Sequence, residues 1–295
     1  MTGPSISLVH DAKAEVGEGA VWDAEAGHLV WVDIDGGRIH RFDPATGPLE
    51  PVEIGERLGC LALCGGSNIL LAAQSGLYDL DLSTGARTLF AEPEAHLPDN
   101  RFNDGTTDRQ GRWWVGSMSL LPAPPPACGT FYRVDADRKV TPVIDGIICT
   151  NGLAFSPDGR TMYFSDSNPA VRTIWAADYD VDEGVPTNRR LFFDTRSVAG
   201  RPDGATVDAD GCYWMAGVGG WQLLRLTPAG EIDMVIDMPI ERPSKPEFGG
   251  PGLTDLYVTS IGINQSPGTV QPHAGGLFVV TGLPAPGLTP ARFPG

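Results

Sequence analysis

The sequence predicts an all-β protein, a six-bladed β-propeller with four antiparallel strands in each blade. Short runs with an alternating apolar pattern recur along all 295 residues, and no long run with a helical period stands out. The 38 glycines and 26 prolines are spread along the chain rather than clustered, which is typical of many short strands joined by turns. The runs also repeat at the length of a four-stranded blade.

The repeat is measured by taking one large apolar residue from each run. Successive markers are 40, 43, 49, 51 and 43 residues apart. They are Trp31, Leu71, Trp114, Tyr163, Trp214 and Tyr257. Six units predict six blades in one closed ring, so residues 1–295 are expected to form a single domain. A two-sheet β-sandwich is the alternative, but a sandwich has no reason to repeat one unit at near-constant spacing.

Each unit is expected to contain a turn, the marker strand, and a second strand that ends at another turn. The first turns are rich in Asp and Gly, the residues that tight turns favour, at 108–111, 157–159 and 208–211. The second strands, some with their closing turns, follow in order at 39–47, 77–85, 130–135, 174–179, 223–230 and 276–280. The strand before each turn is expected to be the innermost of its blade and to line the central channel.

Composition and charge exclude several classes of function. The formal net charge is −16 and the isoelectric point is near 4.6, which opposes binding to nucleic acid. There is no apolar stretch long enough to span a membrane and no apolar signal segment at the N-terminus, so we expect a cytoplasmic protein. The five cysteines are odd in number and scattered, which indicates reduced thiols rather than a disulfide framework.

Polar residues interrupt the expected inner strands at what we interpret as one repeat position. In four units an acid or amide is followed by glycine: Glu18-Gly19, Asp104-Gly105, Asn151-Gly152 and Asp203-Gly204. The second and sixth units differ, with Leu58-Gly59 and Phe248-Gly249. Asn103 stands beside Asp104 and is an alternative side chain to face the axis.

Several carboxylates in a narrow channel repel one another and lose solvation, and a bound divalent cation offsets both costs. Oxygen ligands suit Ca²⁺, Mg²⁺ or Mn²⁺, and Zn²⁺ is a further candidate. Glu18 and Asp203 would balance one such ion if Asn151 and Asn103 supply neutral oxygens. The alternative is that these residues form Asx turns, which would explain the glycines equally well.

At these residues the chain resembles the family of gluconolactonase, regucalcin (senescence marker protein) and related sugar lactonases. The resemblance covers roughly residues 10 to 283, and the order of the segments makes it specific. The matching segments are 17–22, 101–105, 151–156, 202–204, 248–250, 256–259 and 275–278.

The resemblance implies a six-bladed propeller with one catalytic divalent metal ion near the channel mouth. It assigns metal ligation to Glu18, Asn151 and Asp203, and substrate contact to Arg101 and Asn103. We add Asp104, from the same segment, to the candidate substrate-binding residues. Some family members carry an acidic substrate-contacting residue where this chain has 119–121 (Ser-Leu-Leu), so substrate preference is expected to differ from theirs.

The leading hypothesis is hydrolysis of a sugar lactone to the aldonic acid, in carbohydrate catabolism. The metal ion would act as a Lewis acid and activate a water molecule. Asp203 would ligate the ion or act as general base, and Arg101 would orient the substrate and favour developing negative charge. The runner-up is a metal-dependent organophosphate or ester hydrolase at the same site. A third hypothesis, a non-catalytic scaffold, leaves the polar inner strands unexplained.

Three further features have no assigned role. The segment 119–128 contains four prolines and is expected to be a stiff surface loop, either a lid or a plain connector. Arg38, Arg172 and Arg201 are candidates for holding a phosphate or sulfonate at the far end of the substrate. Trp221 is expected either to stack on a sugar face or to pack within its blade.

Overall fold

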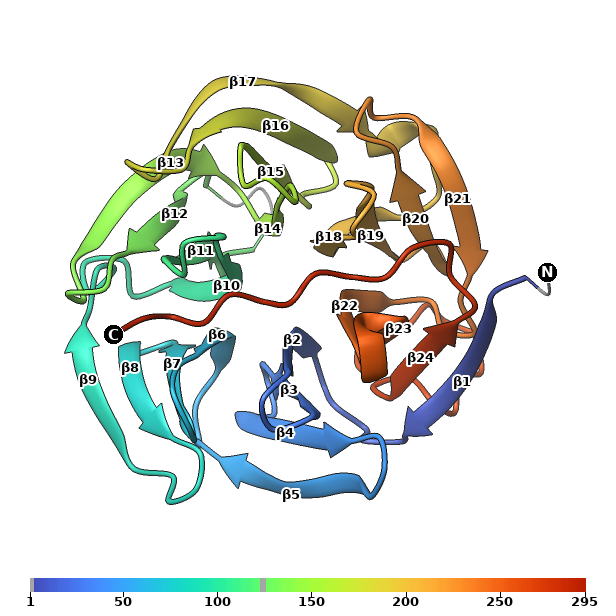
Figure 1. The fold of residues 1–295 in the computed structure, drawn as a ribbon, viewed down its shortest axis with the longest axis horizontal. Helices are drawn as coiled ribbons and strands as arrows, with labels where there is room; N and C mark the ends of the chain where they lie inside the picture. The colour runs from blue at the N-terminus through green and yellow to red at the C-terminus, as the bar shows by residue number, and fades with distance from the viewer. Residues whose placement is uncertain (1–2, 123–125) are drawn as a thin grey trace.

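The structure, a computed structural model, describes residues 3–122 and 126–295 and forms a ring of six four-stranded antiparallel sheets (Figure 1). Blade 1 consists of β2 (Gly17–Asp23), β3 (His28–Asp33), β4 (Arg38–Asp43) and β5 (Gly47–Glu53). Blade 2 consists of β6 (Leu58–Leu63), β7 (Asn68–Ala73), β8 (Gly76–Asp81) and β9 (Arg87–Ala91). Blade 3 consists of β10 (Asn100–Thr107), β11 (Trp113–Ser119), β12 (Gly129–Val134) and β13 (Val140–Ile147).

The second half of the chain repeats this order. Blade 4 consists of β14 (Thr150–Phe155), β15 (Thr161–Asp166), β16 (Thr173–Asp180) and β17 (Val185–Asp194). Blade 5 consists of β18 (Arg201–Val207), β19 (Tyr213–Val218), β20 (Gln222–Leu226) and β21 (Ile232–Asp237). Blade 6 combines β22 (Pro243–Gly249), β23 (Asp255–Ser260) and β24 (Leu277–Thr281) with the N-terminal β1 (Ser5–His10). Two short 3₁₀ helices, η1 (Thr195–Ser197) and η2 (Pro251–Leu253), lie between strands.

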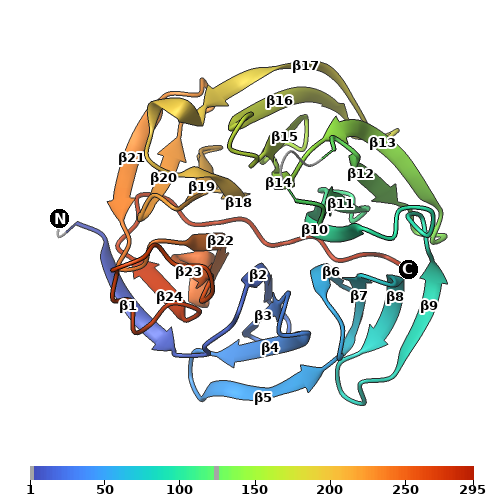
Figure 2. The ribbon, with the colours of Figure 1, turned by 180° about the vertical axis from the view of Figure 1, so that it is seen from behind.

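The predicted six-bladed propeller is confirmed, and each of the six marker residues lies on the second strand of its blade. The ring is closed by β1, whose residues pair antiparallel with β24, so that Ser5 lies opposite Thr281. Both views of the ribbon show the N-terminal strand β1 beside β24 in this blade, and the C-terminal segment runs on from β24 (Figure 2). This pairing places the two ends of the propeller in one sheet, which holds the ring closed.

The hydrophobic core is divided into six clusters, one at each contact between neighbouring blades. The period-two pattern of each strand places alternate side chains on its two faces, and both faces pack against an adjacent blade. The markers Trp31, Trp114 and Trp214 are at most 1% exposed and belong to three different clusters. Burial of these large rings therefore fixes how the blades stack around the axis.

Every inner strand carries a β-bulge at the same depth. In blade 1, for example, two residues between Glu18 and Val21 lie opposite one residue of β3. The same two-to-one mismatch occurs in the other five blades. A bulge bends a strand and re-aims its side chains, so six bulges form one level at which side chains turn toward the axis.

The C-terminal segment after β24 crosses the centre of the ring (Figure 1). It is held by backbone hydrogen bonds from Ala209 N to Pro286 O (2.9 Å) and from Phe293 N to Leu63 O (2.8 Å). Arg292 pairs with Asp23, and Phe293 is buried in the core cluster between blades 2 and 3. These contacts lie at the ends of the inner strands, so the segment closes the channel opposite the level of Glu18 and Asp203.

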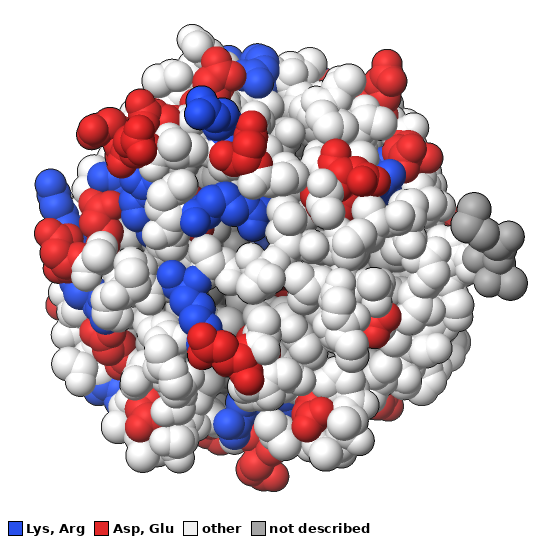
Figure 3. Space-filling model, in the orientation of Figure 1, with Lys and Arg blue, Asp and Glu red and all other residues white. Residues whose placement is uncertain are grey.

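The outer surface carries charges of both signs. On the face drawn in Figure 3, most Lys and Arg side chains stand beside Asp or Glu. None of the helices in the described residues has the length and hydropathy to cross a membrane. In the proline-rich loop, residues 123–125 lie outside the described residues, so the prediction of a stiff lid or connector stays a prediction there.

Candidate active site

Three inner strands from three blades bring together the polar side chains predicted as metal ligands. Glu18 lies on β2, Asn151 on β14 and Asp203 on β18, each in or directly before the bulge of its strand. Their exposed fractions are 6%, 3% and 7%. Three hydrophilic side chains are therefore withdrawn from solvent in one place, which costs free energy unless partners compensate for it.

Asn151 is held so that only its amide oxygen is free. Its Nδ2 donates a hydrogen bond to Ser167 Oγ (2.6 Å), and Ser167 Oγ in turn donates to the carbonyl of Pro202 (2.5 Å). The Oδ1 atom is buried and has no hydrogen-bond partner. A buried unsatisfied oxygen is uncommon in native proteins and indicates that something else completes its coordination.

Glu18 and Asp203 have no cationic partner among the described residues, although each is almost fully buried. Glu18 Oε2 accepts one hydrogen bond, from the backbone N–H of Gly19 (2.9 Å). Burial, together with the charges of Asp203 and Asp104, raises the pKa of Glu18 well above its ordinary value. Burial raises the pKa of Asp203 to about 7, although Arg201 and Arg101 act against this rise.

Arg101 and Asn103 are arranged beside these acids. Arg101 Nη1 donates to Asn103 Oδ1 (2.6 Å) and to the carbonyl of Phe102 (2.8 Å). Asn103 Nδ2 donates to the carbonyl of Thr150 (2.7 Å), which ties blade 3 to blade 4. Burial lowers the pKa of Arg101, while Glu18 and Asp35 act to raise it. The guanidinium is thus fixed in orientation at the level of the acids.

Asp104 is buried in the bulge of β10, and both of its oxygens have partners. Its Oδ2 accepts from the backbone N–H of Leu153 (2.9 Å), and its Oδ1 pairs with Lys245 Nζ (3.2 Å). Asp104 and Lys245 are each 2% exposed. The structure therefore places Asp104 in an internal ion pair that links blades 3, 4 and 6.

The interpretation that all the polar residues share one repeat position is wrong. Measured from the bulges, Glu18 and Asn151 precede the bulge, whereas Asn103 and Asp203 are its first residue and Asp104 is its second. In blade 6 the bulge lies at Ser244 and Lys245, so Phe248-Gly249 is not the counterpart of Glu18-Gly19. Acids from different bulge positions nevertheless lie close enough to interact, since the charges of Asp203 and Asp104 both act on Glu18.

The residues fit a divalent cation that prefers oxygen ligands. The described part of the chain contains no cluster of three or more His, Cys, Asp and Glu side chains suited to a metal ion. The convergent set instead consists of two carboxylates and the unpaired amide oxygen of Asn151. Two negative charges and a neutral oxygen match the charge and the chemistry of Ca²⁺, Mg²⁺ or Mn²⁺.

Comparison with models of protein families identifies the family to which the chain belongs. Residues 16–262 match the model of the SMP-30/gluconolactonase/LRE-like region. The chain belongs to this family. The matched range contains every residue of the convergent set, and it excludes the strand β1 and the C-terminal segment.

Individual members of the SMP-30/gluconolactonase family resemble the chain over nearly its whole length. It is 32% identical over 301 residues to regucalcin from Xenopus laevis, with 100% of both chains covered. It is 36% identical to a 6-deoxy-6-sulfogluconolactonase from Pseudomonas putida, with 95% of each covered. It is 37% identical to an L-arabinolactonase from Azospirillum brasilense, with 98% and 95% covered.

Solved structures of the family have the same architecture. A calcium-binding protein, regucalcin, from Agrobacterium tumefaciens superposes with a TM-score of 0.90 at 30% identity, covering 97% of this chain and 96% of the other. A luciferin-regenerating enzyme superposes with a TM-score of 0.92 at 27% identity, covering 99% and 100%.

Two residues of the site were not predicted from the sequence. Ser167 orients Asn151 from the loop after β15, and Lys245 pairs with Asp104 from blade 6. Ser167 has no sequence signal, because a serine in a polar loop is ordinary. Lys245 does have one: it is a lysine inside a segment that the repeat places on a buried inner strand.

Of the three arginines predicted to hold an anion, two are engaged elsewhere. Arg172 Nη2 donates to the carbonyls of Thr195, Val198, Ala199 and Gly200. Arg38 pairs with Glu53 on the outermost strand of blade 1 (3.5 Å). Arg201 donates one bond, from Nη1 to Ser167 O (3.1 Å). Trp221 is 37% exposed in the turn between β19 and β20.

Proposed function

We propose that this protein is a metal-dependent lactonase that hydrolyses a sugar lactone to the aldonic acid. The observation that supports this most directly is the buried, unpartnered Oδ1 of Asn151 beside two acids without a cationic partner. Two relatives of the chain are named as sugar lactonases, and one solved relative is described as calcium-binding. The proposal combines these two lines of support.

Glu18, Asn151 and Asp203 would hold one divalent ion, which Asn103 would adjoin. When bound, the ion supplies Lewis-acid polarisation of the lactone carbonyl and a water molecule of lowered pKa. In the reaction the oxygen of water bonds to the carbonyl carbon and the ring carbon–oxygen bond breaks. The ring oxygen leaves as a hydroxyl group, and the product carboxylic acid releases a proton.

The side chains around the proposed metal ion have different roles in the reaction. Asp203, as an ionised carboxylate, ligates the ion or accepts the proton of the attacking water. Arg101 is held by Asn103 and the Phe102 carbonyl, so its remaining N–H groups are pre-oriented toward substrate oxygens. Asp104 has both oxygens occupied, and we therefore propose a positioning role for it rather than substrate contact. The donors and acceptors around the acids favour a hydroxyl-rich substrate.

The test is a proton-release assay with a panel of aldonolactones, repeated after metal stripping and after adding back each ion. We expect hydrolysis of at least one aldonolactone, its loss on stripping, and its return with one or more divalent ions. Turnover of a phosphotriester but of no lactone would contradict the proposal and support the organophosphate hydrolase instead. Equal activity before and after stripping would contradict the metal assignment.

A further inference from the structure

The inner channel contains a buried ion pair that the reaction scheme does not use. Lys245 reaches from the bulge of β22 in blade 6 to Asp104 on β10 in blade 3, with 3.2 Å between Nζ and Oδ1. Both side chains are 2% exposed. A buried ion pair rarely stabilises a protein more than apolar residues of similar volume would, so its presence calls for another reason.

The surrounding chain is shaped to admit the lysine. A Cβ atom added to Gly204 would lie 2.5 Å from Lys245 Cδ, so glycine at this position leaves room for the side chain to pass. Gly204 directly follows Asp203, a proposed metal ligand. The backbone N–H of Leu153 fixes the other oxygen of Asp104 from blade 4. The pair is therefore fixed by residues of blades 3, 4, 5 and 6, and two of these, blades 4 and 5, also carry proposed metal ligands.

The pair acts electrostatically on the proposed metal ligands. The charge of Asp104 raises the pKa of Glu18 and of Asp203, and the charge of Lys245 opposes both effects. Burial by itself would lower the pKa of Lys245, but Asp104, Glu247 and Glu18 raise it above its ordinary value. Lys245 is thus a stable cation beneath the acids.

We propose that Lys245 and Asp104 are positioning residues: Lys245 offsets the charge of Asp104, so that the acids Glu18, Asp104 and Asp203 together contribute two net negative charges to the metal centre. Three acids, Glu18, Asp104 and Asp203, share this level of the channel, and Lys245 neutralises the one that is not a ligand. The remaining two negative charges match one divalent ion. This inference depends on the proposed metal site and adds to it a determinant of metal affinity.

The test measures Ca²⁺ binding to metal-stripped protein by calorimetry, at one pH and one ionic strength, and so does not depend on activity. Lys245→Met leaves three uncompensated acids and is expected to tighten binding by about tenfold, whereas Asp104→Asn leaves one acid net and should weaken it by about tenfold. Asp104→Asn keeps the acceptor for Leu153 N–H, so its fold should persist. The double variant restores two negative charges and should bind with nearly the wild-type affinity.

Asp178→Asn is the matched control, since it removes one carboxylate from the outer surface, where Asp178 is exposed. It should leave Ca²⁺ affinity unchanged. If both single variants weaken binding and the double variant is no better than either, the pair is merely structural and the inference is overturned while the metal site stands. If wild-type protein binds no Ca²⁺, Mg²⁺, Mn²⁺ or Zn²⁺, the proposed metal site and this inference both fail.

Discussion

Two buried aspartates, one on strand β18 and one directly after it, differ in how many hydrogen-bond donors surround them. Asp208 directly follows the strand at the end covered by the C-terminal segment and is 0% exposed. Its two oxygens accept four hydrogen bonds: from Asp210 N (3.0 Å), Cys212 N (2.9 Å), Trp214 Nε1 (2.8 Å) and Arg225 Nε (2.7 Å). Asp203, at the mouth, is 7% exposed and has no salt-bridge partner among the described residues.

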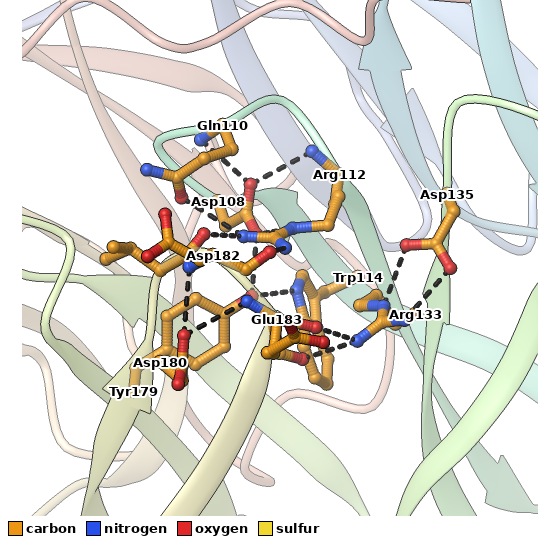
Figure 4. Close-up of polar contacts among 12 residues, drawn as sticks. Asp108, Gln110, Arg112, Trp114, Arg133, Asp135, Tyr179, Asp180, Asp182 and Glu183 are labelled. Carbon is orange, nitrogen blue, oxygen red and sulfur yellow. Dashed lines mark hydrogen bonds and ion pairs between the residues drawn. The ribbon is translucent and has the colours of Figure 1, made fainter.

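Blade 3 repeats the saturated arrangement. Asp108 follows β10, is 0% exposed, and accepts hydrogen bonds from two backbone N–H groups, from Arg112 Nε (2.6 Å) and from the Tyr179 hydroxyl (2.6 Å). Trp114 Nε1 donates to that hydroxyl (3.1 Å), and Figure 4 shows the group between blades 3 and 4. Burial of a carboxylate is therefore not by itself a sign of function. The two acids of the candidate site differ in their number of donors: among the described residues Asp203 accepts no hydrogen bond and Glu18 accepts one.

The largest expected effects come from substituting the two aspartates near β18. Asp203→Asn removes a repelling charge, so we expect the free energy of unfolding to be unchanged or higher while lactonase activity falls by about 10³-fold.

Asp208→Ala leaves the Arg225 guanidinium and the Trp214 N–H with fewer partners, and should lower the free energy of unfolding by about 3 kcal/mol. Denaturant unfolding and initial rates measure both. An active Asp203→Asn, or a stable Asp208→Ala, would contradict the comparison.

Glu247 offers an independent case of a buried acid without a salt-bridge partner among the described residues, and it is none of the proposed metal ligands. It lies on β22 by a cavity of about 40 Å³ lined also by Arg109, Thr106 and Thr206. Burial raises the pKa of Glu247 to about 8 from 4.5, although Lys245 and Arg109 both act to lower it. Between those pH values the folded protein holds a proton that the unfolded chain has lost, so the free energy of unfolding falls as pH rises.

Glu247→Gln should remove that fall. We expect the variant and the wild type to be equally stable below pH 4.5 and the variant to be more stable by several kcal/mol above pH 8. Denaturant unfolding at several pH values, with a chelator in both samples, measures the difference. Parallel curves for the two proteins across this range would show that Glu247 is already ionised in the folded state.

The sequence predicts the blades well, but it predicts neither the pairing that closes the ring nor the path of the C-terminal segment. The Asp-Gly turns and the spacing of Trp31, Trp114 and Trp214 predict the blades, because strand length and turn chemistry are local properties of the chain. The pairing of β1 with β24 joins residues about 270 positions apart, and nothing local specifies it. The sequence of the C-terminal segment has no periodic pattern that would predict its path. That path depends on hydrogen bonds to the turns that the segment crosses.

The sequence pattern indicates the acids and amides of the candidate site but not their register in the bulges. A bulge adds one residue to a strand without changing its composition, so a pattern of acid followed by glycine cannot show which residue faces the axis. For the same reason the pattern aligns Phe248-Gly249 with the other motifs and does not single out Lys245. The unpaired oxygen of Asn151 could not be predicted, because it depends on Ser167 in a different segment.

The candidate site and the surroundings of Asp208 lie at opposite ends of β18. A substitution at Ser167 tests whether the candidate site depends on the orientation of its ligands as well as on their charge. Ser167→Ala removes the acceptor of Asn151 Nδ2, so the amide can rotate and its Oδ1 loses its fixed direction. We expect Ca²⁺ affinity to fall by about tenfold, the low end for groups that orient a ligand, with little change in folding. Calorimetry on stripped protein measures it, with Ser197→Ala as the control in an exposed turn. Unchanged affinity would show that Asn151 needs no support.

The smallest expected effect defines the limit of the comparison. Asp178 pairs with Arg190 at 2.7 Å on the outer strands of blade 4, but the two side chains are 53% and 50% exposed. Water solvates both charges whether or not they pair, and holding two long side chains together costs conformational entropy. Asp178→Ala should therefore leave the unfolding midpoint unchanged within measurement error, whereas Asp208→Ala lowers it. A clear loss of stability in Asp178→Ala would mean that the number of partners, and not burial, determines what an aspartate contributes in this fold.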